Sequence, residues 1–163
     1  MRHGVVFVPL AAAALLVAAC TSTSHSPARA EPSAASDGCA GQPPVSPLPV
    51  WAQAGFSPPD QAMPHVLGEA GNIVAILWAD RNALHSPSLP DRGNKILWVS
   101  RIPFTAPNPL VITATLAGGT RTVTVSVPGG PGPSTIDLPA PGCWTFHLSW
   151  SGHVDALKLR YVA

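Results

Sequence analysis

Residues 139–150, Pro-Ala-Pro-Gly-Cys-Trp-Thr-Phe-His-Leu-Ser-Trp, decide the fold class of this chain. The prolines and the glycine at 139–142 predict a turn, and the strict alternation that follows predicts a half-buried β-strand. One face of this strand holds Trp144, Phe146, Leu148 and Trp150, and the other face holds Cys143, Thr145, His147 and Ser149. We therefore expect an aromatic row in the core and a polar row outside.

Further segments of the chain share strand patterns and are separated by turn residues. They cover 73–79, 95–102, 110–116, 121–127, 134–138 and 155–162. The segments 110–116 and 121–127 are joined through Gly118 and Gly119, which predicts a hairpin. No stretch after residue 39 keeps a helical period. About seven short strands in one domain predict an all-β fold, a β-sandwich.

A proline-rich segment, residues 39–64, precedes the strands. It carries seven prolines but also apolar residues such as Trp51. We expect an extended segment that lies across the domain, with part of it forming an edge strand, where proline is tolerated. We also expect Trp51, Trp78 and Trp98 to serve as core or as cover over the core rather than as a ligand platform.

The first residues predict a leader peptide rather than part of the fold. Arg2 precedes an apolar run, 5–19, of about 15 residues, which is shorter than the roughly 20 residues that span a bilayer as a helix. The residues Leu-Val-Ala-Ala-Cys at 16–20 resemble the lipobox of bacterial lipoproteins. That resemblance implies a signal peptide over 1–19 and a lipid on Cys20. The alternative is an ordinary secreted protein whose leader contains Cys20.

The remaining cysteines form an even pair. With Cys20 assigned to lipid, Cys39 and Cys143 are expected to form a disulfide, because an exported protein meets an oxidising compartment. The bridge would close a loop of 105 residues, counted inclusively. In the chain-entropy treatment such a loop contributes roughly 4–5 kcal/mol. A metal site would need more soft ligands than two distant cysteines.

The composition of the remaining chain separates a tether from a domain and argues against nucleic acid as a partner. Residues 20–38 are small, polar and dotted with proline, so they predict a disordered tether, and 39–163 is the expected domain. Without Arg2 the chain has eight basic and eight acidic residues and no basic run. This argues against nucleic acid as a partner, because phosphates must be neutralised, and against electrostatic membrane binding beyond the lipid anchor.

The C-terminal 25 residues resemble the end of a group of uncharacterised bacterial lipoproteins that are common in actinobacteria. The resemblance lies in Gly142-Cys143-Trp144, the alternating strand after it, and the last strand, which ends in Tyr161-Val162. Together with the lipobox, it implies an immunoglobulin-like β domain on the outer face of the cytoplasmic membrane. It implies no catalytic residue.

Catalytic and metal chemistry find little support in the sequence. The histidines at 65, 85, 147 and 153 are far apart, although Met63-Pro64-His65 is faintly like copper-binding segments of exported proteins. No serine lies in a Gly-x-Ser-x-Gly motif, and the glycine clusters fit hairpin turns rather than phosphate loops. We expect a protein that is not an enzyme and has no cofactor and no metal.

The segment 80–94 is the candidate binding loop. It is long for a connection between strands, and long loops are usually functional or disordered. It carries Arg81, His85, Asp91 and Arg92. We expect a binding or interaction module for a cell-envelope protein or glycan, since sandwich domains often bind through end loops. The alternatives are a loop without a ligand, and a carrier of a small ligand or of copper.

Overall fold

The computed structural model describes residues 1, 4, 38–39, 41–57, 61–78 and 83–163. The predicted signal peptide and Cys20 lie outside these residues, except for Met1 and Gly4. The predicted tether also lies outside them, except for Gly38. The lipid anchor and the tether therefore stay predictions.

Ten strands and one short 3-10 helix make up the described domain. They are β1 (Val45–Pro47), η1 (Val50–Ala52), β2 (Ala62–Leu67), β3 (Ile73–Leu77), β4 (Leu84–His85), β5 (Lys95–Ser100), β6 (Leu110–Leu116), β7 (Thr122–Val127), β8 (Pro133–Thr135), β9 (Gly142–Trp150) and β10 (His153–Val162). Every predicted strand is present, β1 is the edge strand expected within 39–64, and β2 and β4 are additional.

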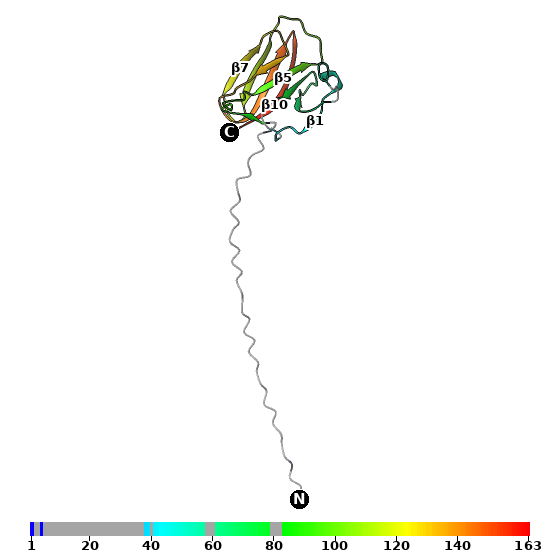
Figure 1. Cartoon of the computed structure of the whole chain (residues 1–163). Helices are drawn as coiled ribbons and strands as arrows, with labels where there is room; N and C mark the ends of the chain where they lie inside the picture. Colours follow the sequence, from blue (N-terminus) through cyan, green and yellow to red (C-terminus); the bar gives the residue numbers. More distant parts are fainter. Residues whose placement is uncertain (2–3, 5–37, 40, 58–60, 79–82) are drawn as a thin grey trace. The chain divides into compact units, whose positions relative to one another are not determined.

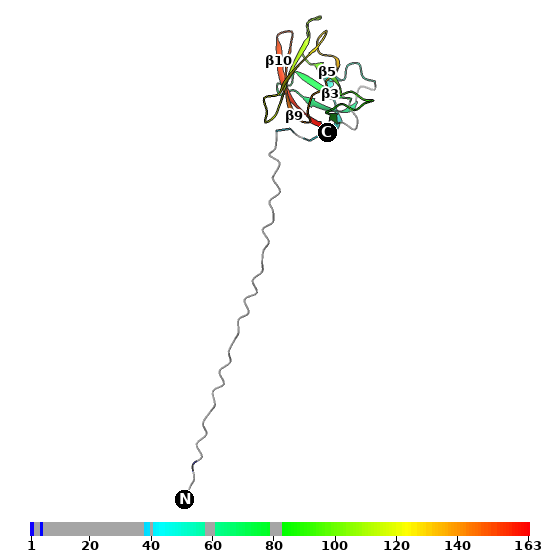
Figure 2. The ribbon, with the colours of Figure 1, turned by 90° about the vertical axis from the view of Figure 1, so that its left-hand side faces the viewer.

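The strands form two five-stranded sheets. Sheet 1 has the order β1-β2-β3-β5-β8 and sheet 2 the order β4-β10-β9-β6-β7. All the pairings are antiparallel except that of β4 with β10. The sheets pack face to face, as Figures 1 and 2 show from two directions. The predicted fold is confirmed: the domain is an all-β, immunoglobulin-like sandwich.

The predicted aromatic row of β9 is buried as a whole, whereas on the other face Cys143 is buried at the disulfide and Thr145 is half-buried. Trp144 and Phe146 are fully buried, whereas His147 and Ser149 are exposed. Phe146 packs between two other aromatic rings, with ring centroids 6.2 Å from Trp98 and 6.5 Å from Tyr161. The aromatic row of β9 is thus the centre of the core, as the sequence predicts.

Each of the three fully buried tryptophans in the described domain has an acceptor for its indole N–H. The donor–acceptor pairs are Trp98 Nε1 to Ser134 Oγ (2.9 Å), Trp144 Nε1 to the Ala140 carbonyl (3.0 Å) and Trp150 Nε1 to Ser100 Oγ (3.1 Å). Burying an indole without an acceptor would cost free energy. These bonds therefore fix the orientation of each ring in the core.

Strand β3 is buried on both faces, which explains its uninterrupted apolar sequence. Ile73, Ala75 and Leu77 join the central core, whereas Val74 and Ile76 face outward. The outward pair is covered by residues of the proline-rich segment, namely Leu48, Trp51, Ala52 and Phe56. The prediction that this segment lies across the domain is confirmed, and β1, with Pro47, is its edge strand.

Strand β2 begins inside the proline-rich segment, although the prolines of 39–64 disfavour regular structure there. Pro64 pairs with Val45 of β1, while the pairing of β2 with β3 starts one residue later, at His65. Proline has no N–H to donate to a neighbouring strand, so it disrupts a strand that is paired on both sides. Pro64 is tolerated because it lies where β2 is paired on the β1 side alone.

The disulfide between Cys39 and Cys143 is present, with its two Cα atoms 5.6 Å apart. Cys143 lies opposite Arg160 in the β9–β10 ladder, and Arg160 Nη2 donates to the Cys39 carbonyl at 3.3 Å. These residues share the outward face of sheet 2, opposite to Trp144. The bridge therefore holds the proline-rich segment to the outside of sheet 2, as the register of β9 predicts.

A short strap links the two sheets at one open edge of the sandwich. We define the strap as Gly38, Cys39 and residues 41–44. It starts at the disulfide on sheet 2 and leads into β1 on sheet 1. It contacts the space between β2 and β10, since residues of all three segments line one pocket there. The strap thus covers the gap between the sheets.

Asp155 joins the β2–β3 turn to sheet 2. The carboxylate is 7% exposed and accepts three backbone N–H bonds, from Ala70 (2.9 Å), Asn72 (3.0 Å) and Ala156 (2.8 Å). Gly68 packs so closely on this carboxylate that a Cβ at position 68 would overlap it. A glycine and a buried aspartate, 87 positions apart, therefore depend on each other.

We expect Asp155→Ala to lower the free energy of unfolding by about 2–3 kcal/mol, because partly buried N–H donors lose their acceptor. Denaturant unfolding of the full chain measures the loss. Asp155→Asn keeps one acceptor oxygen and should lose less. Asp91→Ala, at an exposed position, is the control and should stay within about 0.5 kcal/mol of wild type. Equal stability of the two alanine variants would contradict the role of Asp155.

Candidate binding face

Trp78 is the most exposed aromatic residue in the described part of the chain. It directly follows β3, and its backbone N–H donates to the Lys95 carbonyl at 3.0 Å. The residue is 54% exposed. Phe56 stacks on one side of the indole, with ring centroids 6.4 Å apart and planes inclined by 30°. This contact orients the ring while much of the indole remains open to solvent.

The expectation that all three tryptophans serve as core or cover is wrong for Trp78. Trp98 is in the core and Trp51 covers the outer face of sheet 1, as predicted. The alternation of β3 directs Trp78 to the same outer face as Val74 and Ile76. On that face its ring stacks on Phe56. The proline-rich cover thus leaves over half of the indole exposed.

A groove of about 470 Å³ lies beside this indole on the outer face of sheet 1. We call it the Trp78 groove. Its lining consists of Trp78, Lys95, Ile96, Leu97, Pro133, Ser134 and Thr135. Lys95 pairs with Thr135 and Leu97 with Pro133 in the β5–β8 ladder, so these four residues share the outward face. The volume falls in the range of roughly 300–1,000 Å³ typical of ligand sites.

The chemistry of the Trp78 groove is that of a flat apolar platform with a few polar groups. The indole and Leu97 supply the apolar surface, while the Lys95 ammonium and the Thr135 hydroxyl lie at exposed positions. Aromatic rings with polar neighbours suit ligands that are apolar on one face and polar at their edges. Lys95 is the single charged residue in this lining.

Two residues that line the Trp78 groove bracket the predicted loop 80–94 in the sequence: Trp78 two positions before it and Lys95 directly after it. Arg81 lies outside the described residues. His85 belongs to β4 and is half-buried, whereas Asp91 and Arg92 are exposed near a bridge between Leu89 and Arg92. The three described residues line neither the Trp78 groove nor the strap pocket described below. The structure does not bring them together as one site.

The part of this loop that the structure describes is held by polar contacts. Asn94 is 2% exposed. Its Oδ1 accepts the backbone N–H of His85 at 2.7 Å. Its Nδ2 donates to the His85 carbonyl at 2.9 Å and to Asp137 Oδ1 at 2.7 Å. Ser86 Oγ donates to the Leu138 carbonyl at 2.6 Å. These bonds hold the end of β4 to Asn94 and to the segment that precedes β9.

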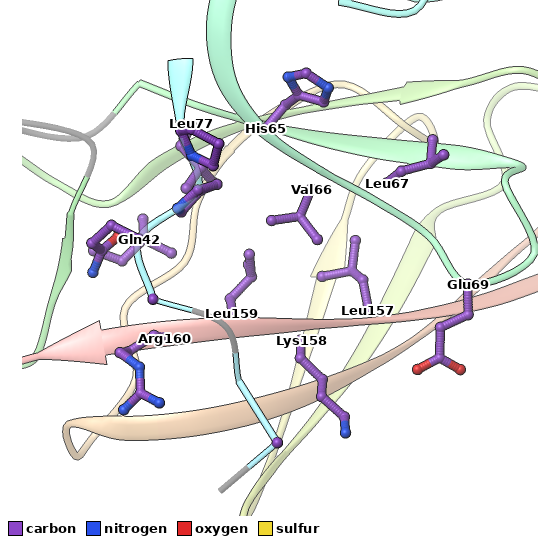
Figure 3. Close-up of a pocket in the computed structure, with 15 residues that line it drawn as sticks. Gln42, His65, Val66, Leu67, Glu69, Leu77, Leu157, Lys158, Leu159 and Arg160 are labelled. Atoms are coloured by element: carbon purple, nitrogen blue, oxygen red, sulfur yellow. The ribbon is translucent and has the colours of Figure 1, made fainter. Parts of the chain in front are cut away.

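A second hollow, the strap pocket, has a volume of about 510 Å³ and lies between the strap, β2 and β10. Figure 3 shows Leu157 and Leu159 pointing from β10 toward Val66, whereas Lys158 and Arg160 point the other way. Leu157 and Leu159 are at most 2% exposed, so the pocket ends on the sealed core. It is a depression under the strap rather than a deep apolar cavity.

Gln42 supplies an unusual polar atom in the strap pocket. Its Nε2 is buried and has no hydrogen-bond partner among the described residues. A buried amide donor without an acceptor is costly, and native proteins satisfy such groups with protein, water or ligand. The strap pocket thus offers a donor to a small molecule with an acceptor oxygen.

The four histidines of the domain lie on different elements. His65 Nδ1 is 2.9 Å from the Met63 carbonyl, His153 packs on Trp150 with ring centroids 5.8 Å apart, and His147 is exposed. Among the described residues, no three His, Cys, Asp or Glu side chains lie close enough together to hold a metal ion.

Tyr161 is a buried ionisable group with a structural role. Burial, with a smaller contribution from the negative charge of Asp137, raises the pKa of Tyr161 above its ordinary value. Its hydroxyl donates to the Ile136 carbonyl at 2.7 Å. The phenol therefore stays protonated at neutral pH and ties β10 to the segment between β8 and β9.

Comparison with known proteins adds no relative to this picture. No protein-family model, no curated protein and no solved structure matches the chain. In the described part of the chain, no helix is long and apolar enough to cross a membrane.

Proposed function

We propose that this protein is an extracytoplasmic lipoprotein whose single immunoglobulin-like domain is a non-enzymatic binding module in the cell envelope. The lipobox sequence supports an anchor through Cys20 at the outer face of the cytoplasmic membrane. The observation that carries the binding role is the exposed Trp78 indole, oriented by Phe56 beside a groove on the outer face of sheet 1.

The ligand that best fits the Trp78 groove is a neutral glycan. A sugar ring has an apolar C–H face that can stack on an indole, and hydroxyls at its edge that can bond to groups such as Lys95 and Thr135. The groove carries a single charge, and the sequence without Arg2 has a net charge of zero. The positive Lys95 disfavours a basic ligand, and its ammonium can donate to the hydroxyls of a sugar.

We expect Trp78→Ala to weaken binding to purified cell-wall polysaccharide at least tenfold, which corresponds to about 1.4 kcal/mol. Calorimetric titration and co-sedimentation with the full chain measure the effect. The free energy of unfolding should change by less than about 1 kcal/mol, because the side chain is over half exposed.

The matched control is Val154→Ala, which removes an exposed apolar side chain, 70% exposed, from sheet 2. This variant should bind like wild type. Absence of glycan binding by wild type would overturn the glycan as ligand, and crosslinking to one envelope protein through Trp78 would replace it with a protein partner. Equal binding by Trp78→Ala would remove the groove as the site.

A second candidate function, a carrier of a small ligand, is favoured by the unsatisfied Gln42 amide in the strap pocket. Such a ligand would be compact and would present an acceptor oxygen to Nε2. The same experiments distinguish the two candidates. A small molecule seated under the strap would raise the melting temperature equally in wild type and in Trp78→Ala.

A further inference from the structure

The described structure has four sheet edges, and three of them are protected against pairing with another chain. Proline cannot donate to a ladder, and short strands offer little to pair with. In sheet 1, β1 contains Pro47 and β8 contains Pro133. In sheet 2, β4 has only two residues and is soon followed by Pro87.

The fourth edge, β7, lacks each of these protections. It has six residues, Thr-Val-Thr-Val-Ser-Val at 122–127, with no proline and no charge. It pairs with β6 on one side and is the last strand of sheet 2 on the other, at the margin of the domain in Figure 1. Val123 and Val125 pack against the core but are only half-buried. Open edges of this kind are templates for strand pairing.

We propose that β7 pairs antiparallel with β7 of a second copy of this chain, which joins the two copies of sheet 2 into one ten-stranded sheet. The strand is self-complementary about a two-fold axis through Val125. In that register Val123 lies opposite Val127 of the second copy, and Thr124 lies opposite Ser126 of the second copy. Valines therefore meet on the core side and hydroxyls meet on the solvent side, as an isologous contact requires.

Charge and burial both favour this pairing. Arg121, the nearest charge before β7, lies opposite Gly129 of the second copy, so the two arginines sit at opposite ends of the contact. Pairing would cover the exposed part of Val123 and Val125 and extend the core across the axis. The dimer leaves the outer face of sheet 1 free, so it is independent of ligand binding at Trp78.

Disulfide crosslinking of the full chain in its own membranes tests the proposal. Val125→Cys places a thiol on the axis, and an added oxidant should convert most of the protein to a dimer on a non-reducing gel. Val154→Cys, an exposed position on β10, is the matched control and should remain monomeric. Wild type treated with the same oxidant shows how much dimer forms through the native cysteines.

A second substitution shows whether the crosslink depends on strand pairing. Thr124 is exposed, so Thr124→Lys should leave the fold intact while placing two positive charges beside the axis. In the Val125→Cys background it should reduce the dimer at least tenfold. The proposal is overturned if Val125→Cys stays monomeric, if Val154→Cys crosslinks equally, or if Thr124→Lys has no effect.

Discussion

Replacing Trp144 with alanine is expected to lower the free energy of unfolding by about 3–5 kcal/mol. The indole is fully buried in the central core, and its N–H donates to the Ala140 carbonyl at 3.0 Å. The substitution removes the apolar area of the ring, leaves a cavity, and frees the carbonyl of the turn before β9. Small sandwich domains are only marginally stable, so this loss is a large share of the total.

Denaturant unfolding followed by far-ultraviolet circular dichroism measures this loss without relying on tryptophan fluorescence. His147→Ala is the matched control, because His147 is on the same strand but on the exposed face; it should change stability by less than about 0.5 kcal/mol. Trp144→Phe should fall between the two. An unchanged midpoint for Trp144→Ala would contradict its place in the core.

Removal of the disulfide is expected to cost about 2–5 kcal/mol, with the chain-entropy value for this loop at the upper end. Cys39 and Cys143 are 104 positions apart, so the bridge removes much of the freedom of the unfolded chain. The double variant Cys39→Ser with Cys143→Ser is the appropriate test, because a single substitution would leave a reactive thiol. Part of the loss should come from the strap, which the bridge holds on sheet 2.

Two measurements separate the disulfide from the new serines. Wild type unfolded in excess dithiothreitol should match the double variant, and the same reductant should not alter the double variant further. A variant that is as stable as oxidised wild type would show that the strap and β1 are held by their other contacts alone.

Much of this fold follows from the sequence, because the deciding signals are local. The alternation in β9 and in β7 reports which side chains face the core, and the apolar run of β3 reports burial on both faces. Once the sequence prediction assigns Cys20 to a lipid, Cys39 and Cys143 are the one pair left to form a disulfide. These inferences need no knowledge of distant contacts, so the structure confirms them.

The parts that sequence reasoning missed depend on contacts between distant segments. Strand β4 exists because Leu84 pairs with Tyr161, 77 positions away, and two residues carry no periodic pattern. Pro64 argued against a strand at β2, and only the pairing register shows that its missing N–H is harmless. Asp155 gave no signal, because its partners are backbone N–H groups.

The candidate site was missed for a related reason. Trp78 ends an apolar run, so the sequence predicts burial, and its exposure depends on how far the proline-rich cover extends. The predicted loop 80–94 is close in sequence to the candidate site, because Trp78 and Lys95 stand on either side of it and both line the Trp78 groove. The charged residues chosen within it, however, do not form a site.

The position of the disulfide has a mechanical consequence. A pull on the N-terminal part of the chain reaches Cys39 first, and the bridge transmits it to Cys143 on β9. This strand lies inside sheet 2, paired with β10 along its whole length and with β6 from Trp144 to Ser149. The load is therefore shared by two ladders and reaches the sheet without first passing through β1 and η1. A domain built this way resists unfolding by a force applied to its N-terminal side.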